Sequence, residues 1–225
     1  MSQIVFLPGF DGDAELRREF LDALAVNHQV RAVSYPNRAL GSLDAYREHA
    51  MGEMPVDWSP VVVAESFSGL VAARWAAMDS RVRVLVLCGS FVRNPVGPAA
   101  AVGASLPAFV KLGQVLMGPM AWASGDARRL RWGAGLARAL SGLGDDVVAE
   151  RLRLIASEDV GAHLGQLRIP TIVVHFTSDS VIGPLARAQL ESACRNPRVV
   201  RVEGPHFALA TRPRECAAAI TAILA

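Results

Sequence analysis

The sequence predicts a single α/β domain: a doubly wound, mainly parallel sheet of six strands with helices on both faces. Short apolar runs rich in β-branched residues recur along the 225 residues, and helical patterns lie between them. Strands that alternate with helices are joined by crossover connections, which produce a parallel sheet covered on both sides. We expect strands near residues 3–7, 29–34, 60–65, 83–88, 171–176 and 198–202, and helices over 14–26, 42–54, 68–79, 184–194 and 212–224.

The composition is that of a folded globular protein. Hydrophobic residues make up 52% of the chain and charged residues 20%, so the chain can bury a core and is not expected to be disordered. The formal net charge of +2 is too small to indicate a nucleic acid or an anionic membrane as a partner. The length fits one domain, residues 1–225, that carries an insertion.

The cysteine content indicates a reducing environment. Cys88, Cys194 and Cys216 are odd in number and lack the spacing of metal ligands, so we expect free thiols. The N-terminus shows no secretory signal, and a cytoplasmic location is expected. Because the sequence has no phosphate-binding glycine loop and no nucleotide fingerprint, we expect neither a cofactor nor a metal.

A serine directly follows the third predicted strand. That strand ends at Ser66, and an alanine-rich, helix-forming segment begins within two residues. Such a tight strand-to-helix turn is a nucleophile elbow, which forces unusual dihedral angles on the serine and exposes its hydroxyl at the edge of the sheet. The neighbouring backbone approaches closely, so small residues are needed two positions before and after, and here these are Ala64 and Ser68.

Other predicted strands end in loops that complete an acyl-transfer site. The first strand leads into the loop Pro8–Gly12, Asp179 follows the fifth strand, and His206 follows the sixth. The carboxyl ends of parallel strands meet at one edge of a sheet, where ligands bind in open α/β folds. We therefore expect Ser66, Asp179 and His206 to lie close together at that edge.

This pattern resembles the α/β-hydrolase superfamily, whose nucleophile, acid and base follow one another in this chain order. The resemblance runs from Leu7-Pro8-Gly9, through the elbow, to Gly204-Pro205-His206-Phe207. It implies the strand order 2-1-3-4-5-6 and a helical cap inserted after the fourth strand. The sequence departs from the family pattern in three ways. It begins at the strand that would be third in the full fold, Pro8-Gly9 stands where His-Gly is usual, and Ala64 and Ser68 replace the usual glycines.

We expect the cap to comprise residues 93–168. This stretch contains no convincing strand and is rich in glycine, proline and alanine. A long apolar stretch raises the alternative of a membrane span. Four prolines interrupt it, however, and only short helical runs can form between them; these are Pro95, Pro98, Pro107 and Pro119. A cap that roofs the site, without stable membrane insertion, is therefore the prediction.

These parts suggest a mechanism. His206 would take the proton of Ser66 as a base and return it to the leaving group, while Asp179 would hold the imidazole in the correct tautomer. The backbone N–H groups of Phe10 and Phe67 would form the oxyanion hole. The expected outcome is hydrolysis of a small-molecule carboxylic ester or thioester through an acyl-serine.

Apolar side chains near the elbow are expected to contact the substrate, namely Phe91 and Phe207 together with Phe10 and Phe67. One hypothesis for the arginines of the cap is that they dock an acidic carrier, such as an acyl-carrier protein or a coenzyme-A thioester. A solvated helix face is the alternative that we favour. The arginines concerned are Arg128, Arg129, Arg131 and Arg138.

Other candidates for these roles fit less well. His175 lies inside an apolar strand and is predicted to be a buried histidine with satisfied hydrogen bonds. Asp159 lies in the trailing segment of the cap and does not follow a strand. Asp11 is expected to stabilise its own loop through Asx-type hydrogen bonds, and Glu65 to point away from the nucleophile. The remaining histidines are predicted to be surface or packing residues: His28, His49 and His163.

Two classes of function remain open from the sequence. The first is a serine hydrolase of esters or thioesters, although relatives with this triad also cleave carbon–carbon bonds. The second is a protein that keeps the fold as a pocket for a small ligand, with little or no turnover. The reactivity of Ser66 discriminates between them. The sequence does not indicate the oligomeric state.

Overall fold

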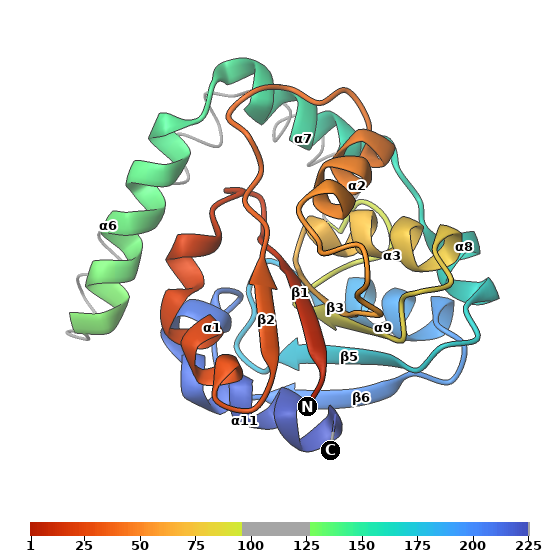
Figure 1. Ribbon diagram of the computed structural model, residues 1–225. Helices are drawn as coiled ribbons and strands as arrows, with labels where there is room; N and C mark the ends of the chain where they lie inside the picture. Colours follow the sequence, from red (N-terminus) through yellow and green to blue (C-terminus); the bar gives the residue numbers. More distant parts are fainter. Residues whose placement is uncertain (96–126, 225) are drawn as a thin grey trace.

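A computed structural model describes residues 1–95 and 127–224 of the chain (Figure 1). Its six strands form one parallel sheet in the order β2-β1-β3-β4-β5-β6, which confirms the predicted order. The strands lie within two residues of their predicted positions. They are β1 (Gln3–Leu7), β2 (Gln29–Ala32), β3 (Val61–Glu65), β4 (Val84–Cys88), β5 (Thr171–Phe176) and β6 (Arg198–Val202).

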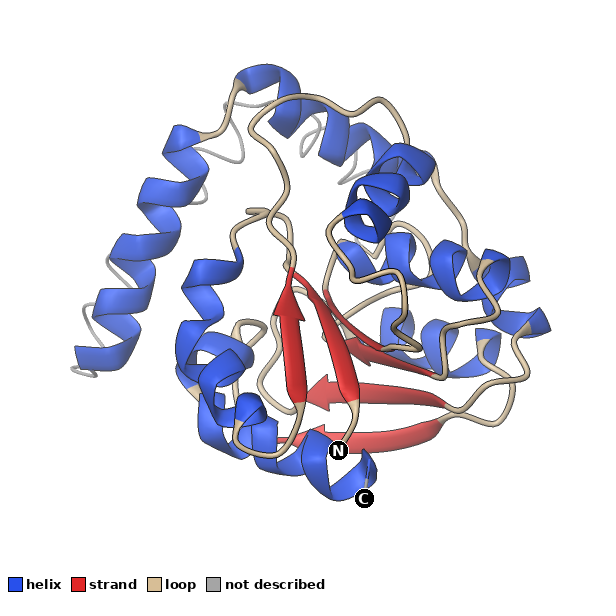
Figure 2. Cartoon of the chain, in the orientation of Figure 1, coloured by secondary structure: helices blue, strands red, loops and turns tan. Residues whose placement is uncertain are grey.

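Helices follow the strands and cover both faces of the sheet (Figure 2). On one face lie α1 (Arg18–Ala25) and α11 (Pro213–Leu224), and on the other lie α2 (Leu43–Gly52), α3 (Ser68–Met78), α8 (Gly161–Gln166) and α9 (Pro184–Ala193). The remaining described helices are η1 (Ala14–Arg17), α6 (Ala127–Gly142), α7 (Asp145–Ser157) and α10 (Ala208–Thr211).

The helix predicted over residues 14–26 is divided in two. A 3₁₀ turn, η1, comes first because the side chain of Asp13 accepts a hydrogen bond from the N–H of Glu15 and caps it. The backbone then leaves helical geometry at Arg17, with φ −112° and ψ 19°, and α1 begins at the next residue. The side chain of Arg17 enters the protein interior at this break.

The sheet separates two hydrophobic cores. Phe6 of β1 packs edge-on against Phe20 of α1, with ring centroids 5.7 Å apart, in the core beneath α1 and α11. Tyr46 and Trp75 are fully buried in the core on the opposite face. Every residue of β3 and β5 is buried, as expected for central strands of a parallel sheet covered on both faces. The loops that follow these strands therefore begin from a closely packed framework.

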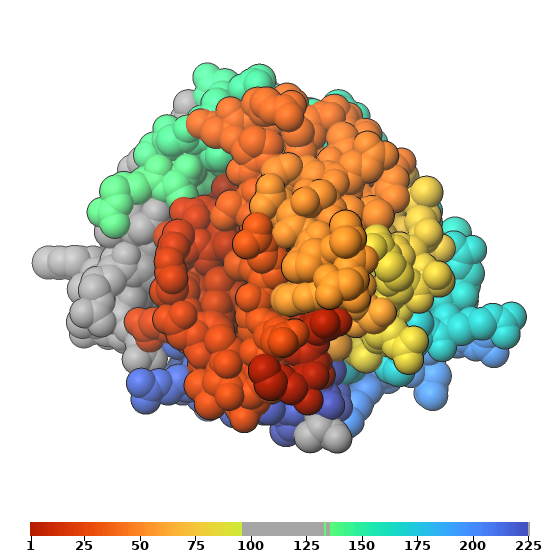
Figure 3. Space-filling view, in the orientation of Figure 1, coloured from red at the N-terminus to blue at the C-terminus, as the bar shows by residue number. Residues whose placement is uncertain are grey.

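The insertion after β4 is helical over its described part. Its helices α6, α7 and α8 follow the predicted pattern, whereas the part of the predicted cap from 96 to 126 lies outside the described residues. The carboxylate of Glu150 on α7 accepts hydrogen bonds from the N–H groups of Leu40 and Gly41 and, at 3.0 Å, from the Tyr46 hydroxyl. The helix α7 and the segment before α2 consequently form one continuous surface (Figure 3).

A membrane-crossing helix was the alternative for this insertion. In residues 1–95 and 127–224, none of the helices has the length and apolar character needed to cross a bilayer.

The end of α3 provides a pH-dependent contribution to stability. Asp79 accepts hydrogen bonds from the Trp75 indole N–H at 3.1 Å and from the Arg81 guanidinium at 2.8 Å. The bond from Arg81 is the largest cause that lowers the pKa of Asp79, from 3.8 to about 2. The ionised carboxylate therefore stabilises the folded state above pH 4.

We predict that Asp79→Asn lowers the free energy of unfolding by about 1–2 kcal/mol at pH 7. The loss should shrink as the pH falls from 4 toward 2, because the wild-type carboxylate then becomes protonated and its advantage disappears. Urea unfolding of both proteins at pH 7, 4, 3 and 2 measures this. A difference in unfolding free energy that stays constant over the series would contradict the prediction.

Candidate active site

Ser66 occupies the junction between β3, which ends at Glu65, and α3, which begins at Ser68. Its φ of +50° lies in the left-handed region that non-glycine residues rarely adopt. Such a conformation costs on the order of 1–3 kcal/mol and persists only where its surroundings hold it. Here the N–H of Ser66 donates to the carbonyl of Cys88 at 2.9 Å, and the Ser90 hydroxyl donates to the carbonyl of Ser66 at 2.9 Å.

The packing of Gly69 against Ser90 explains why this elbow needs a residue without a side chain in the first turn of α3. A Cβ added at Gly69 would lie 1.7 Å from the Ser90 hydroxyl oxygen and 2.7 Å from the Ser90 Cβ. Ser90 therefore comes close enough to bind the carbonyl of Ser66 only because Gly69 leaves room for it.

The structure brings the three residues of the predicted triad together. The Nε2 atom of His206 lies 3.0 Å from the hydroxyl oxygen of Ser66, and its Nδ1 lies 2.8 Å from Oδ2 of Asp179. An ionised carboxylate only accepts hydrogen bonds, so Nδ1 carries the proton and Nε2 is left to accept the proton of the serine. The other oxygen of Asp179 accepts the N–H groups of Val181 and Ile182, both at 2.8 Å.

Asp179 is held in its ionised form although it is buried. Burial by itself would raise its pKa, but the hydrogen bond and charge of His206, together with the two backbone N–H donors, lower the pKa below its usual value. Arg187 on α9 also fixes this loop, because its guanidinium donates to the carbonyls of Asp179 and Ile182 at 2.9 and 2.8 Å. The acid is thus charged and fixed before a substrate arrives.

Successive peptide groups of the loop after β1 are held by hydrogen bonds to their carbonyls. The Ser68 hydroxyl donates to the carbonyl of Pro8, the N–H of Gly12 donates to that of Gly9 at 3.1 Å, and the Arg151 guanidinium donates to that of Phe10 at 2.6 Å. Within the described parts of the chain, the N–H groups of Phe10 and Phe67 donate to no other backbone group. Their assignment to the oxyanion hole stays a prediction.

Ser68 has a role that its small size alone did not indicate. Its hydroxyl is fully buried and donates to the carbonyl of Pro8, so the Tyr35 hydroxyl, 2.7 Å away, donates to Ser68 in turn. These two hydrogen bonds link the start of α3 to the loop after β1. A serine where the elbow usually has glycine was the available signal for it, since glycine could not make this contact.

A second missed residue is Arg17, which is buried beneath the elbow. Its guanidinium pairs with Asp11 through contacts of 2.7 and 2.8 Å and with Glu65 at 2.7 Å. Asp11 also accepts the N–H of Asp13 at 2.9 Å, the Asx-type hydrogen bond expected from the sequence. Burial raises the pKa of Glu65, although Arg17 opposes the shift. The cluster joins the loop after β1 to the residue before Ser66.

Of two phenylalanines expected to contact the substrate, one lies beside the triad and the other lies in the core. Phe207 packs edge-on against the His206 ring, with centroids 5.0 Å apart. Phe91 is almost completely buried among the core residues, and its contact with a substrate stays a prediction. Of the cap arginines, Arg138 is exposed on α6, whereas the side chains of the other three, Arg128, Arg129 and Arg131, lie outside the described part.

The other residues considered for the roles of base and acid form hydrogen bonds with other partners. His175 is buried and its Nε2 lies 2.8 Å from the carboxylate of Glu191, in agreement with the expectation of a satisfied core histidine. Asp159 accepts the N–H of Gly161 at 2.8 Å and pairs with Arg93 at 3.4 Å, whereas the carboxylate beside His206 is that of Asp179. No group of three or more histidine, cysteine, aspartate or glutamate side chains in the described ranges has the arrangement of a metal site.

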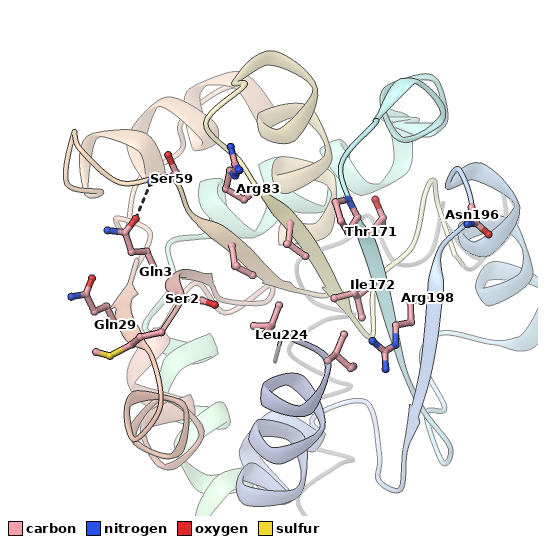
Figure 4. A pocket seen from close by; sticks show the side chains of 15 residues that line it. Ser2, Gln3, Gln29, Ser59, Arg83, Thr171, Ile172, Asn196, Arg198 and Leu224 are labelled. Atoms are coloured by element: carbon pink, nitrogen blue, oxygen red, sulfur yellow. Dashed lines mark hydrogen bonds between the residues drawn. The ribbon is translucent and has the colours of Figure 1, made fainter.

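A hollow of about 700 Å³ lies at the opposite end of the sheet, where Arg83, Thr171 and Arg198 border it near the chain ends (Figure 4). The strands begin at this end, and none of the three triad residues lines the hollow. The predicted chemistry needs the carboxyl ends of the strands, so we do not assign the substrate to this hollow.

Comparison with known proteins agrees with this geometry. The sequence matches the alpha/beta hydrolase family over residues 4–219. The chain belongs to the alpha/beta hydrolase family. Over 92% of its length, this hydrolase is 28% identical to part of the polyketide synthase ThaQ from Burkholderia thailandensis. It spans only 11% of the length of that relative.

Solved structures share the fold of this hydrolase. The enol-lactonase from Burkholderia xenovorans LB400 superimposes with a TM-score of 0.82 at 16% identity, covering 99% of this chain and 91% of that one. A bromoperoxidase from Bacillus anthracis gives 0.82 at 15% identity, with coverage of 99% and 91%. A thermophilic esterase from Thermogutta terrifontis gives 0.82 at 16% identity, with coverage of 100% and 89%. These three names differ in chemistry, so the substrate must be argued from the site.

We predict that Gly69→Ala destabilises the hydrolase by about 2–3 kcal/mol, because the added methyl group overlaps Ser90 and forces it away from the carbonyl of Ser66. Urea unfolding measures this. Combining it with Ser90→Gly removes the overlapping atoms, so the double variant should be more stable than the sum of the two single losses. Strict additivity of the two losses would contradict the steric explanation.

Proposed function

We propose that this hydrolase cleaves a carboxylic ester or thioester through an acyl-serine intermediate on Ser66. The observation that carries the proposal is the continuous line of hydrogen bonds from Ser66 to His206 and from His206 to Asp179, with distances of 3.0 and 2.8 Å. A serine hydroxyl is a weak nucleophile at neutral pH, and it needs a base within hydrogen-bond reach. Nε2 of His206 occupies that position.

In the acylation half-reaction, the oxygen of Ser66 attacks the carbonyl carbon while its proton passes to Nε2 of His206. The imidazolium that forms is stabilised by the ionised Asp179, whose lowered pKa keeps it charged. The tetrahedral intermediate collapses when the bond to the alcohol or thiol breaks. The leaving group takes the proton from His206 and departs.

In the deacylation half-reaction, water attacks the acyl-serine. His206 removes a proton from that water and then returns it to Ser66, so the products are the free acid and the regenerated hydroxyl. The negative oxygen formed in both steps needs two preorganised donors, and we assign the N–H groups of Phe10 and Phe67 to that role. A donor of this type contributes on the order of 10²- to 10³-fold in rate.

The proposed class of substrates is broader than the proposed reaction mechanism. Phe207 beside His206 favours an apolar acyl group next to the catalytic base. The similarity to part of a polyketide synthase adds polyketide-derived acyl groups to the substrates that should be tested first. Both free esters and carrier-bound thioesters fit the mechanism, because the leaving group departs after the same acylation step.

We predict that a fluorophosphonate labels the purified wild-type protein stoichiometrically at Ser66, with the modified peptide mapped by mass spectrometry. Ser66→Ala should abolish labelling and lower kcat by about 10⁶-fold, and His206→Ala should also prevent labelling. His49→Ala is the matched control, because the His49 imidazole binds the carbonyl of Ser34 and lies outside the triad. Labelling that survives Ser66→Ala would overturn the proposal, and a folded wild-type protein that does not react would favour a ligand-binding function.

A further inference from the structure

We propose that Arg151, on helix α7 of the insertion, is a positioning residue for the oxyanion hole. This inference rests on the proposed function. Its guanidinium fixes the peptide group that follows the Phe10 N–H, and through Tyr46 it also supports Phe67. The placement of α7 beside α2 and the loop after β1 would thus set the geometry of both oxyanion donors, although Arg151 itself touches neither the substrate nor the triad.

The environment of Arg151 is unusual for a guanidinium that only supports the fold. The side chain is fully buried, and no carboxylate of the described residues forms an ion pair with it, although Glu150 is its neighbour in sequence. Its contacts are the carbonyl of Phe10 at 2.6 Å, the Tyr46 hydroxyl at 3.0 Å, and the rings of Tyr35 and Tyr46, each 5.5 Å from the guanidinium carbon. Burying a cation without an anion is costly. An apolar side chain of similar length would fill the same space at lower cost, so the hydrogen bond to Phe10 needs a reason beyond packing.

That reason lies in the geometry of consecutive peptide groups. Each trans peptide is a rigid plane in which the N–H and C=O point in opposite directions. The peptide that carries the Phe10 N–H is held through its other end, where the carbonyl of Gly9 accepts the N–H of Gly12 at 3.1 Å. The next peptide is held by Arg151 through the carbonyl of Phe10. Both planes that meet at Phe10 are therefore fixed, and the direction of its N–H is defined. Without Arg151, only one of them is held.

Gly12 supplies independent support for a close approach of the arginine. Its φ is +74°, and a Cβ at this position would stand 2.7 Å from Nη1 of Arg151. Glycine is therefore required here both by the backbone conformation and by the space that the guanidinium occupies. The loop is shaped to admit Arg151.

The second oxyanion donor is reached through Tyr46. The Tyr46 hydroxyl donates to Glu150 and accepts from Arg151, both at 3.0 Å, and its ring packs edge-on against Phe67 with centroids 5.4 Å apart. Phe67 carries the donor that the elbow provides. Two adjacent residues of α7 thus hold one tyrosine between them, and that tyrosine contacts the residue after the nucleophile.

The experiment compares Arg151→Met and Arg151→Lys with Arg74→Met. Arg74 on α3 is a suitable control because its guanidinium bridges Asp44 at 2.9 Å and Glu158 at 2.8 Å, so its loss also removes half-buried polar contacts. The readouts are kcat and KM for an aryl ester, the rate constant of fluorophosphonate labelling, and Tm.

We predict that Arg151→Met lowers kcat by about 100-fold, with KM changed less than about twofold, because a misaligned donor affects the transition state and not ground-state binding. The labelling rate should fall in parallel. Arg151→Lys should recover part of kcat, because an ammonium group can reach one of the two oxygens that the guanidinium spans. Arg74→Met should lower Tm and leave kcat within about twofold of wild type.

Equal kcat values for Arg151→Met and Arg74→Met at matched Tm loss would overturn the inference, since Arg151 would then act only on stability. If Arg151→Met does not fold, Tyr46→Phe decides, because it removes only the hydroxyl that Arg151 binds; a kcat equal to wild type would also overturn the inference. Failure of the proposed function is distinguishable, because the wild-type protein would then show neither labelling nor turnover before any variant is made.

Discussion

The rest of the site depends on one constraint: Ser66 has to be held at a positive φ between β3 and α3. The strand beneath it is buried along its whole length, and the carbonyl of Cys88 fixes the Ser66 N–H while Ser90 fixes its carbonyl. Ser90 reaches that carbonyl only because Gly69 lacks a side chain. A conformation that would be unfavourable in an isolated peptide is therefore held in place by the packing and hydrogen bonds around it.

Two buried arginines near this elbow, Arg17 and Arg151, make different kinds of contact. On the side of α1, Arg17 neutralises two carboxylates that would repel each other if left alone in the interior. On the side of α7, Arg151 interacts with a carbonyl dipole and aromatic faces instead of a carboxylate. The two guanidinium groups hold the loop after β1 from different directions, one at Asp11 and the other at Phe10. The loop is thereby fixed by polar contacts, while the sheet below it is fixed by apolar packing.

Much of the fold followed from the sequence, because strands buried on both faces read as apolar runs and the turns between them are marked by glycine and proline. The strand order needed the family resemblance, since periodicity does not specify which strands pair. The positions of Asp179 and His206 after β5 and β6 followed from strand ends. Arg151 could not be predicted: it lies 141 residues from Phe10 in the chain, within a helix whose other arginine, Arg153, is exposed. Nothing local separates a buried arginine from a solvated one until tertiary contacts are known.

The two chain ends lie next to each other where the strands begin (Figure 1), and Met1 and Leu224 border the same hollow there. Ser66 lies at the other end of the sheet, directly after the end of β3. An affinity tag, a surface tether or a fused domain joined to either end would therefore extend away from Ser66. A short linker between the ends would also suit circular permutation, in which new termini are opened in an exposed surface turn and the sheet is left continuous.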